Sequence, residues 1–179
     1  GATVTTAGGN LAVSGALNAG AITLLSGGGV TLSSGSTVTA TGSTDDSIVI
    51  SGTSFTNNAG SAVLNPGSGR WLVYSTSPAG SFENGLTGAA DPSMPRLYGH
   101  SYPVAIAEPG NHLVYSTQPT LTATADNKSK TYGGIDPALT YSLAGFINDD
   151  GVVDTAITAG MSGGAILSAA TGAAATAGT

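Results

Sequence analysis

Side chains that commonly carry out chemistry are few in this sequence. It has two histidines, His100 and His112, and no cysteine. Serine is abundant, but no spacing pairs a serine nucleophile with either histidine. The absence of cysteine excludes both a disulfide framework and a thiolate metal site. We therefore expect no enzymatic activity and no catalytic residue.

The stretch INDDGVVD, residues 147–154, contains part of a calcium-loop pattern. Three of its residues suit the third, fifth and sixth positions of an EF-hand loop, namely Asn148, Asp150 and Gly151. The first position holds Phe146 and the twelfth holds Ile157, so both essential anionic ligands are missing. We interpret the stretch as a polar hairpin turn. Asp45 and Asp46 have no third carboxylate near them in the sequence, and we expect no metal and no cofactor.

Charge is sparse and mostly negative. Ten Asp and Glu residues outnumber four cations, and the net charge is −6. The cations are Arg70, Arg96, Lys128 and Lys130. Four scattered cations cannot neutralise a run of phosphates, so the sequence excludes nucleic-acid binding. Asn127 begins the one N-x-[ST] sequon, but a single sequon in a chain rich in Ser and Thr is close to chance, and we assign no glycosylation there.

The sequence predicts that the secondary-structure elements of this chain are short strands. β-Branched residues are separated by Gly, Ser and Asn, which is typical of an all-β chain with tight turns. Three pairs of inward-facing apolar residues recur every 18 to 19 positions: Leu11 and Val13, Val30 and Leu32, and Ile48 and Ile50. Weaker apolar positions lie between them at Leu17, Ile22, Leu24 and Val38. Each period therefore predicts one coil of about three strands, and residues 1–66 predict a right-handed parallel β-helix with the three pairs stacked in one column.

The sequence LVYST occurs twice, in RWLVYSTSP and in NHLVYSTQP 41 residues later. The turn signals of NPGSG, residues 65–69, place a boundary just before the first copy. In that copy Trp71 and Val73 face one way and Leu72 and Tyr74 the other, so both faces need cover. An aromatic strand laid across the last coil would hide its core and its unpaired edge. Residues 67–119 therefore predict a closure segment with paired LVYST strands, in which His112 replaces Trp71 in a packing role.

The third part, LTATADNKSKTYGGIDPALTYSLAGFINDDG at 121–151, is similar to the start of the small domains called MBG or YDG. The matching residues are Ala125-Asp126, Lys128, Lys130 to Gly133, Asp136-Pro137, Leu139 to Tyr141 and Gly145-Phe146. Together with NPGSGRWLVYSTSPA, it resembles the β-helix junction of two-partner-secretion adhesins of Gram-negative bacteria, the filamentous-haemagglutinin type. The resemblance implies that residues 120–179 form a truncated β-domain, a sandwich or β-grasp-like fold, because such domains continue with more strands.

The same resemblance implies a function. The chain would be an internal fragment of a secreted, cell-surface adhesin that serves as a stalk and as an attachment or biofilm-cohesion element. Its implied partners are an outer-membrane transporter and glycans, a host surface or matrix polysaccharide, although no ligand-binding residue can be named. An alternative is a self-assembling extracellular filament without a receptor, in which a neighbour's residues 1–6 add a strand to an open edge. A β-helical polysaccharide-cleaving enzyme is disfavoured because the carboxylates are scattered.

Overall fold

The computed structural model of the chain describes residues 1–42, 45–86, 96–146, 148–149 and 152–153. Within these residues every regular element is a strand. The part of the chain that the structure describes has no helix long and apolar enough to span a membrane. The predicted all-β class is confirmed.

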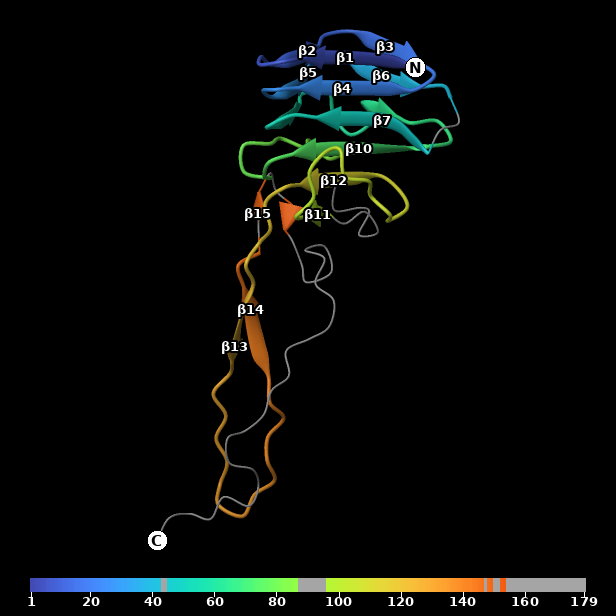
Figure 1. Cartoon of the computed structure of the whole chain (residues 1–179). Coiled ribbons are helices and arrows are strands. Elements are labelled where there is room, and N and C mark those ends of the chain that lie inside the picture. Colours follow the sequence, from blue (N-terminus) through green and yellow to red (C-terminus); the bar gives the residue numbers. More distant parts are fainter. Residues whose placement is uncertain (43–44, 87–95, 147, 150–151, 154–179) are drawn as a thin grey trace.

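Most strands belong to three parallel sheets that form a solenoid (Figure 1). Sheet A has the order β1-β4-β7-β10-β12-β11. Its strands are β1 (Ala2–Thr6), β4 (Ile22–Ser26), β7 (Asp46–Ser51), β10 (Arg70–Ser75), β12 (His112–Tyr115) and β11 (Leu97–Tyr98). Sheet B stacks β2 (Leu11–Val13), β5 (Val30–Leu32) and β8 (Phe55–Asn57), and sheet C stacks β3 (Ala16–Ala19), β6 (Thr37–Ala40) and β9 (Leu64–Asn65). Three consecutive strands, one in each sheet, make one coil, as the sequence predicts.

The solenoid core is filled by the alternate residues of each strand. Leu32, Val38, Ile48 and Ile50 are completely buried, and the core also takes in Phe55 from sheet B. Complete burial of a side chain of this size contributes roughly 1.5–3 kcal/mol relative to leaving it exposed. Burial of the stacked side chains therefore stabilises the contact between successive coils.

One corner of the solenoid requires glycine. Gly20 and Gly42 follow β3 and β6 in successive coils, and the Gly42 N–H donates to the Gly20 carbonyl at 2.7 Å. A Cβ atom on Gly42 would lie 2.4 Å from that oxygen. Because real Cβ atoms do not approach so closely, the stacking of the coils at this corner depends on a residue without a side chain.

The predicted column of three apolar pairs is correct for its first two members and wrong for the third. Leu11 lies beside Val30, as expected. The position above Val30 is occupied by Phe55, whereas Ile48 lies in sheet A above Ile22. The physical reason is a longer turn. The connection from sheet C to sheet A lengthens in the second coil, because Leu17 is five residues before Ile22 but Val38 is ten residues before Ile48. The sequence interval between stacked residues of sheet A therefore grows from 20, for Ala2 and Ile22, to 26, for Ile22 and Ile48.

The two LVYST copies pair directly as parallel strands β10 and β12. They extend sheet A as further rungs instead of crossing the end of the last coil. Leu72 lies beside His112, and Val73 lies beside Leu113, so the register is offset by one residue from the sequence identity. A shift of one residue moves every side chain to the other face of a strand. Equivalent residues of the two LVYST copies therefore face opposite sides of sheet A. Val73 and Leu113 face the core, while Leu72 and Val114 face outward.

A buried polar group closes this end of the core. The Tyr115 hydroxyl donates to Glu83 Oε1, and Arg96 Nε lies 2.9 Å from the same oxygen. The side chains of Glu83 and Arg96 are only 1% and 2% exposed. Tyr98 stacks on Tyr115, with ring centroids 5.7 Å apart. Burial, reinforced by the neighbouring Glu83, raises the pKa of Tyr115 and keeps its hydroxyl protonated as a donor.

Two small antiparallel pairs follow the solenoid. Strands β13 (Thr122–Ala125) and β14 (Tyr141–Ala144) form a hairpin that projects away from the coils, and β15 (Asn148–Asp149) pairs with β16 (Val152–Val153) (Figure 1). A small antiparallel sheet after a parallel solenoid agrees with the predicted order of folds. The rest of the predicted truncated domain, beyond residue 153, lies outside the described residues.

Candidate functional site

Within the residues that the structure describes, the histidines and carboxylates considered above do not come together in a metal site. His112 is buried in β12, with Nε2 3.1 Å from the Pro109 carbonyl, whereas His100 lies in a loop. Among the described residues no three His, Asp or Glu side chains are grouped so that they could hold a metal ion. Asn148 lies in β15, and Asp150 and Gly151 of the calcium-like stretch are outside the described residues.

One sequence signal for chemistry was missed. The stretch GMSGG at 160–164 has the letters of the G-x-S-x-G nucleophile motif. In the hydrolases that use it, this motif needs a strand-to-helix turn around its serine. Residues 160–164 lie outside the described residues, within a stretch rich in Ala, Gly and Ser.

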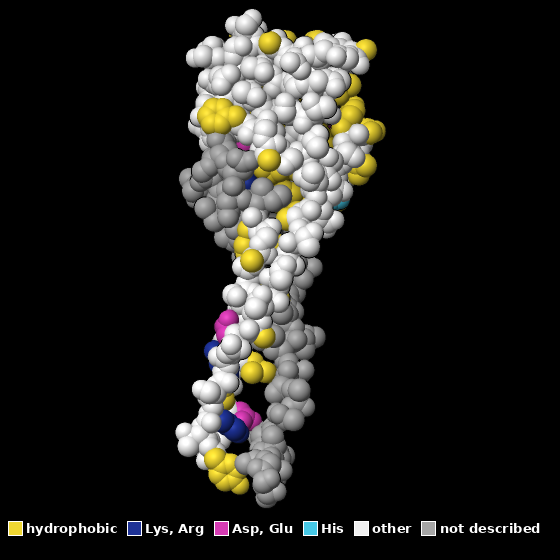
Figure 2. Space-filling model, turned by 90° about the vertical axis from the view of Figure 1, so that its left-hand side faces the viewer, with side chains coloured by type: hydrophobic (Ala, Val, Ile, Leu, Met, Phe, Trp, Pro, Cys, Tyr) yellow, Lys and Arg dark blue, Asp and Glu magenta, His cyan; other side chains and the backbone are white. Residues whose placement is uncertain are grey.

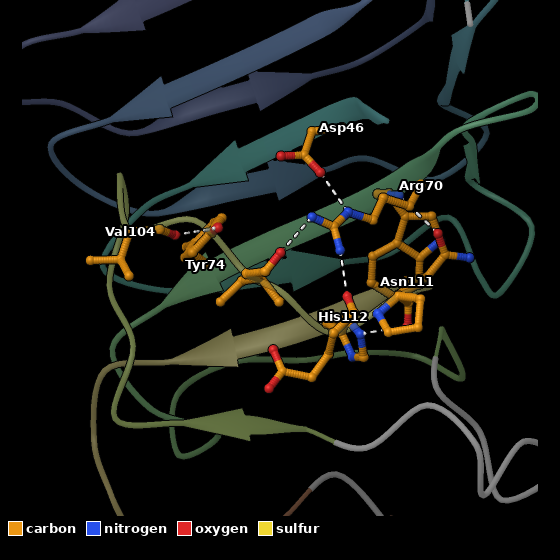
Figure 3. Close-up of polar contacts among 10 residues, drawn as sticks. Asp46, Arg70, Tyr74, Val104, Asn111 and His112 are labelled. Atoms are coloured by element: carbon orange, nitrogen blue, oxygen red, sulfur yellow. Dashed lines mark hydrogen bonds and ion pairs between the residues drawn. The ribbon is translucent and has the colours of Figure 1, made fainter. Parts of the chain in front are cut away.

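Arg70 joins sheet A to a loop that covers it, residues 99–111, which we call the covering loop (Figure 3). Its Nε donates to Asp46 Oδ1 at 2.5 Å, one coil below. Its Nη1 and Nη2 donate to the carbonyl oxygens of Glu108 at 2.5 Å and Ile106 at 2.8 Å. The guanidinium group is therefore engaged by three partners, and its charge is matched by a carboxylate.

Further hydrogen bonds fix the middle and the last residue of the covering loop (Figure 3). The Trp71 N–H donates to Asn111 Oδ1 at 2.8 Å, and the Tyr74 hydroxyl donates to the Val104 carbonyl at 3.0 Å. Burial, with the Asp46 carboxylate as the second cause, raises the pKa of Tyr74 and keeps this donor protonated.

Under the loop lies a small second core on the outer face of sheet A, made of Leu72, Tyr74, Ile106 and Val114 with Val49 and Leu97 at its edge. Sheet A thus has both faces covered at β10, as its alternating aromatic sequence predicts. A hollow of about 520 Å³ beside Arg70 is lined by polar and backbone-rich residues such as Asp45, Ser68 and Asn111. Because three of the five Arg70 N–H donors are engaged and Asp46 matches its charge, this hollow offers little to an anion.

A second depression, of about 170 Å³, runs along the ends of successive strands of sheet A, and we call it the hydroxyl groove. Its lining residues are Ser26, Ser51, Gly52, Thr53, Tyr74, Ser75, Thr76, Ser101, Tyr102 and Ser116. None of them is charged. Tyr102 from the covering loop is 40% exposed and meets Tyr74 edge to face, with ring centroids 5.6 Å apart and planes at 73°.

The hydroxyls of this groove differ in their engagement. The Tyr74 hydroxyl bonds the covering loop, and Ser75 Oγ lies 3.3 Å from Ser81 Oγ. Ser26 Oγ donates to the Gly9 carbonyl at 2.7 Å, and Ser116 Oγ donates to the Thr76 carbonyl at 3.3 Å, so these two support turns. A second group makes no side-chain hydrogen bond within the part of the chain that the structure describes, namely Ser51, Thr53, Thr76, Ser101 and Tyr102. None of these residues was predicted from the sequence, because the topology that aligns them is not visible in the sequence alone.

Charged side chains are concentrated elsewhere. Figure 2 shows few of them over the solenoid and several along the projecting hairpin. There Lys130 Nζ pairs with Asp136, and the Thr140 hydroxyl donates to Asp126. The tip of the hairpin also carries the strongly exposed Tyr132 and Ile135.

Comparison with known proteins identifies only the last third of the chain. Residues 121–179 match the family described as MBG domain, YGX type. This region contains Tyr132, Gly133 and Gly134 and begins at the projecting hairpin. No curated protein and no solved structure matches the chain. A parallel β-solenoid that continues into an MBG-type region fits an extracellular structural or adhesin-like repeat protein.

Proposed function

We propose that this chain is a stalk segment of a secreted filamentous adhesin and contributes to attachment or biofilm cohesion. The observation that carries the proposal is the continuation of the parallel solenoid, through the paired strands β10 and β12, into a region that matches the MBG domain family. In a solenoid each coil contacts only its neighbours, so every added coil lengthens a rod of constant cross-section. A rod of this kind can hold adhesive domains away from a cell surface.

The proposal includes secretion through an outer-membrane transporter partner, as in the filamentous-haemagglutinin type of adhesin that residues 60–179 resemble. It includes no enzymatic activity. Three carboxylates of the described residues, those of Asp46, Glu83 and Asp136, are held in ion pairs with Arg or Lys side chains.

Display of the full chain on a non-adherent bacterium tests the attachment role. We expect more displaying cells to be retained under flow on a surface coated with epithelial cells or matrix polysaccharide than cells that display Leu32→Asp, in which the solenoid core is disrupted. A Thr31→Asp variant, altered on the outward face of the same strand, serves as the matched control and should behave like the unchanged chain. Equal retention by all three strains would contradict the proposal.

A self-assembling filament is the second candidate, and one observation favours it. In the described residues the outer edges of β1, β2 and β3 have no partner, and an apolar hollow of about 270 Å³ lies beside them, lined by residues that include Val4, Leu11 and Leu17. An unpaired edge of this kind is a template for another chain. Donation of residues 1–6 to a neighbour would first require β1 to leave β4, with which it pairs over five residues.

Sedimentation velocity over a range of concentrations separates the two candidates. A stalk segment should keep one sedimentation coefficient from micromolar to near-millimolar concentration. A steady rise in that coefficient would favour the self-assembling filament, and its persistence after deletion of residues 1–6 would exclude strand donation through β1.

A further inference from the structure

We propose that the hydroxyl groove is a binding site for a neutral oligosaccharide. This inference rests on the proposed attachment function and deepens it by naming a ligand class and a location. It starts from three properties of the groove: its elongated course, its exposed aromatic ring and its lack of charge.

The course of the groove follows the solenoid axis. Its lining takes Ser26 from β4, Ser51 at the end of β7, Ser75 at the end of β10 and Ser116 just after β12. These four strands are consecutive neighbours in sheet A. Adjacent strands lie about 4.8 Å apart, so three steps span about 14 Å. A ligand that follows the groove is therefore a short chain with a repeat close to one strand spacing, as a linear oligosaccharide has.

The chemistry of the lining suits sugar rings. The C–H faces of a pyranose pack on aromatic rings, and Tyr102 offers an exposed ring that Tyr74 holds from the side. Hydroxyl side chains both donate and accept hydrogen bonds, as the hydroxyls of a sugar do. Ser51, Thr53, Thr76 and Ser101 supply such groups without a side-chain partner in the described residues.

The absence of charge selects a neutral ligand. An acidic sugar or a phosphate would need a cation, and the described residues that line the groove include none. The arginine of strand β10, Arg70, donates to Asp46 and to two carbonyl groups of the covering loop. A depression of about 170 Å³ is smaller than the pockets that enclose drug-sized ligands. We therefore expect weak binding of a single chain, with dissociation constants in the millimolar range, and strong retention only when many copies act together.

Titration of the ¹⁵N-labelled full chain with cellotetraose and with chitotetraose, followed by NMR, tests the proposal. We expect the amide signals of Ser51, Thr53, Thr76 and Tyr102 to shift with at least one of the two sugars. A heparin tetrasaccharide, as a charged probe, should leave them unchanged. Shifts with the charged probe alone, or with none of the three, would overturn the proposal.

Two variants and two matched controls locate the site. Tyr102→Ala should weaken binding at least tenfold, and Thr76→Val, which keeps the shape of an exposed side chain and removes one hydroxyl, should weaken it about fivefold. The corresponding changes on the hairpin, Tyr132→Ala and Thr131→Val, should leave the affinity unchanged. Equal affinity in the groove variants and in the controls would overturn the assignment even if a sugar binds. If sugar binding fails while displayed cells are still retained under flow, the ligand assignment is wrong and the stalk function stands.

Discussion

At the residue scale, the few charged side chains of the solenoid serve its structure. Arg70 holds the covering loop to sheet A, and Arg96 pairs with Glu83 at the closed end of the core. These two sites differ in exposure, because Asp46 beside Arg70 is 41% exposed whereas Glu83 is 1% exposed. Solvent screens the first pair and not the second, so their contributions to stability should differ.

The substitution Arg70→Ala should lower the free energy of unfolding by about 1–3 kcal/mol, mostly through the two lost bonds to loop carbonyls. Urea denaturation measures this change. Lys128→Ala, an exposed cation on the projecting segment, is the control and should change stability by less than about 0.5 kcal/mol. If the two variants are equally stable, the covering loop is not held by Arg70.

The substitution Glu83→Gln should cost about 3–5 kcal/mol, because it breaks a buried ion pair by removing one of its two partners. The change also weakens the acceptor of the Tyr115 hydroxyl. Asp136→Asn breaks the exposed pair with Lys130 and should cost at most about 1 kcal/mol. Comparable thermal midpoints for the two variants would show that solvent reaches the Glu83–Arg96 pair and screens it.

At the element scale, the sequence allows the kind of coil to be predicted but not its register. The strands of all three sheets alternate apolar side chains that face the core with polar side chains that face outward. The pattern of Ile48 and Ile50 therefore suits any of the three sheets. The length of the turn between β6 and β7 decides which sheet they join, and no local pattern states that length in advance. The register of the two LVYST copies is likewise not visible in the sequence. Their letters are identical, yet β10 has a register irregularity between Arg70 and Trp71 and the copies face opposite ways.

The candidate site was less predictable than the fold. The resemblance implied glycans among the partners, but no ligand-binding residue could be named from the sequence. The residues of the hydroxyl groove come from three strands, the residues that follow strands of sheet A, and the covering loop, over positions 26 to 116. Only the stacking of coils of unequal length brings them together.

The substitution Leu32→Asp places a carboxylate at a completely buried position of β5 and should cost several kcal/mol, since nothing there can pair with it. Limited proteolysis of the variant should cleave within residues 1–66, which resist cleavage in the unchanged chain. Thr31→Asp, on the outward face of the same strand, should keep that resistance. Rapid cleavage of both variants, or of neither, would contradict the inward orientation of Leu32.

At the scale of the whole molecule, the first and the last described coils differ. One end is closed by β12, β11 and the buried Glu83–Arg96 pair. The other presents the edges of the first coil beside an apolar hollow. Charged side chains are sparse between the two ends and gather on the projecting hairpin (Figure 2). The stalk proposal depends on this arrangement, because a rod transmits force only if its coils are stacked in one continuous register.

Engineered disulfides test that continuous register most directly, because the chain has no cysteine of its own. Parallel neighbours at equivalent positions lie within the Cα separation of about 4.4–6.8 Å that a disulfide needs. The structure pairs Thr31 with Thr56, whereas the uniform period of 18 residues would pair Thr31 with Val49. Under mild oxidation, monitored by mass spectrometry, we expect Thr31→Cys with Thr56→Cys to form an intramolecular disulfide and Thr31→Cys with Val49→Cys to remain reduced. Cross-linking of the second pair without the first would contradict the solenoid described here.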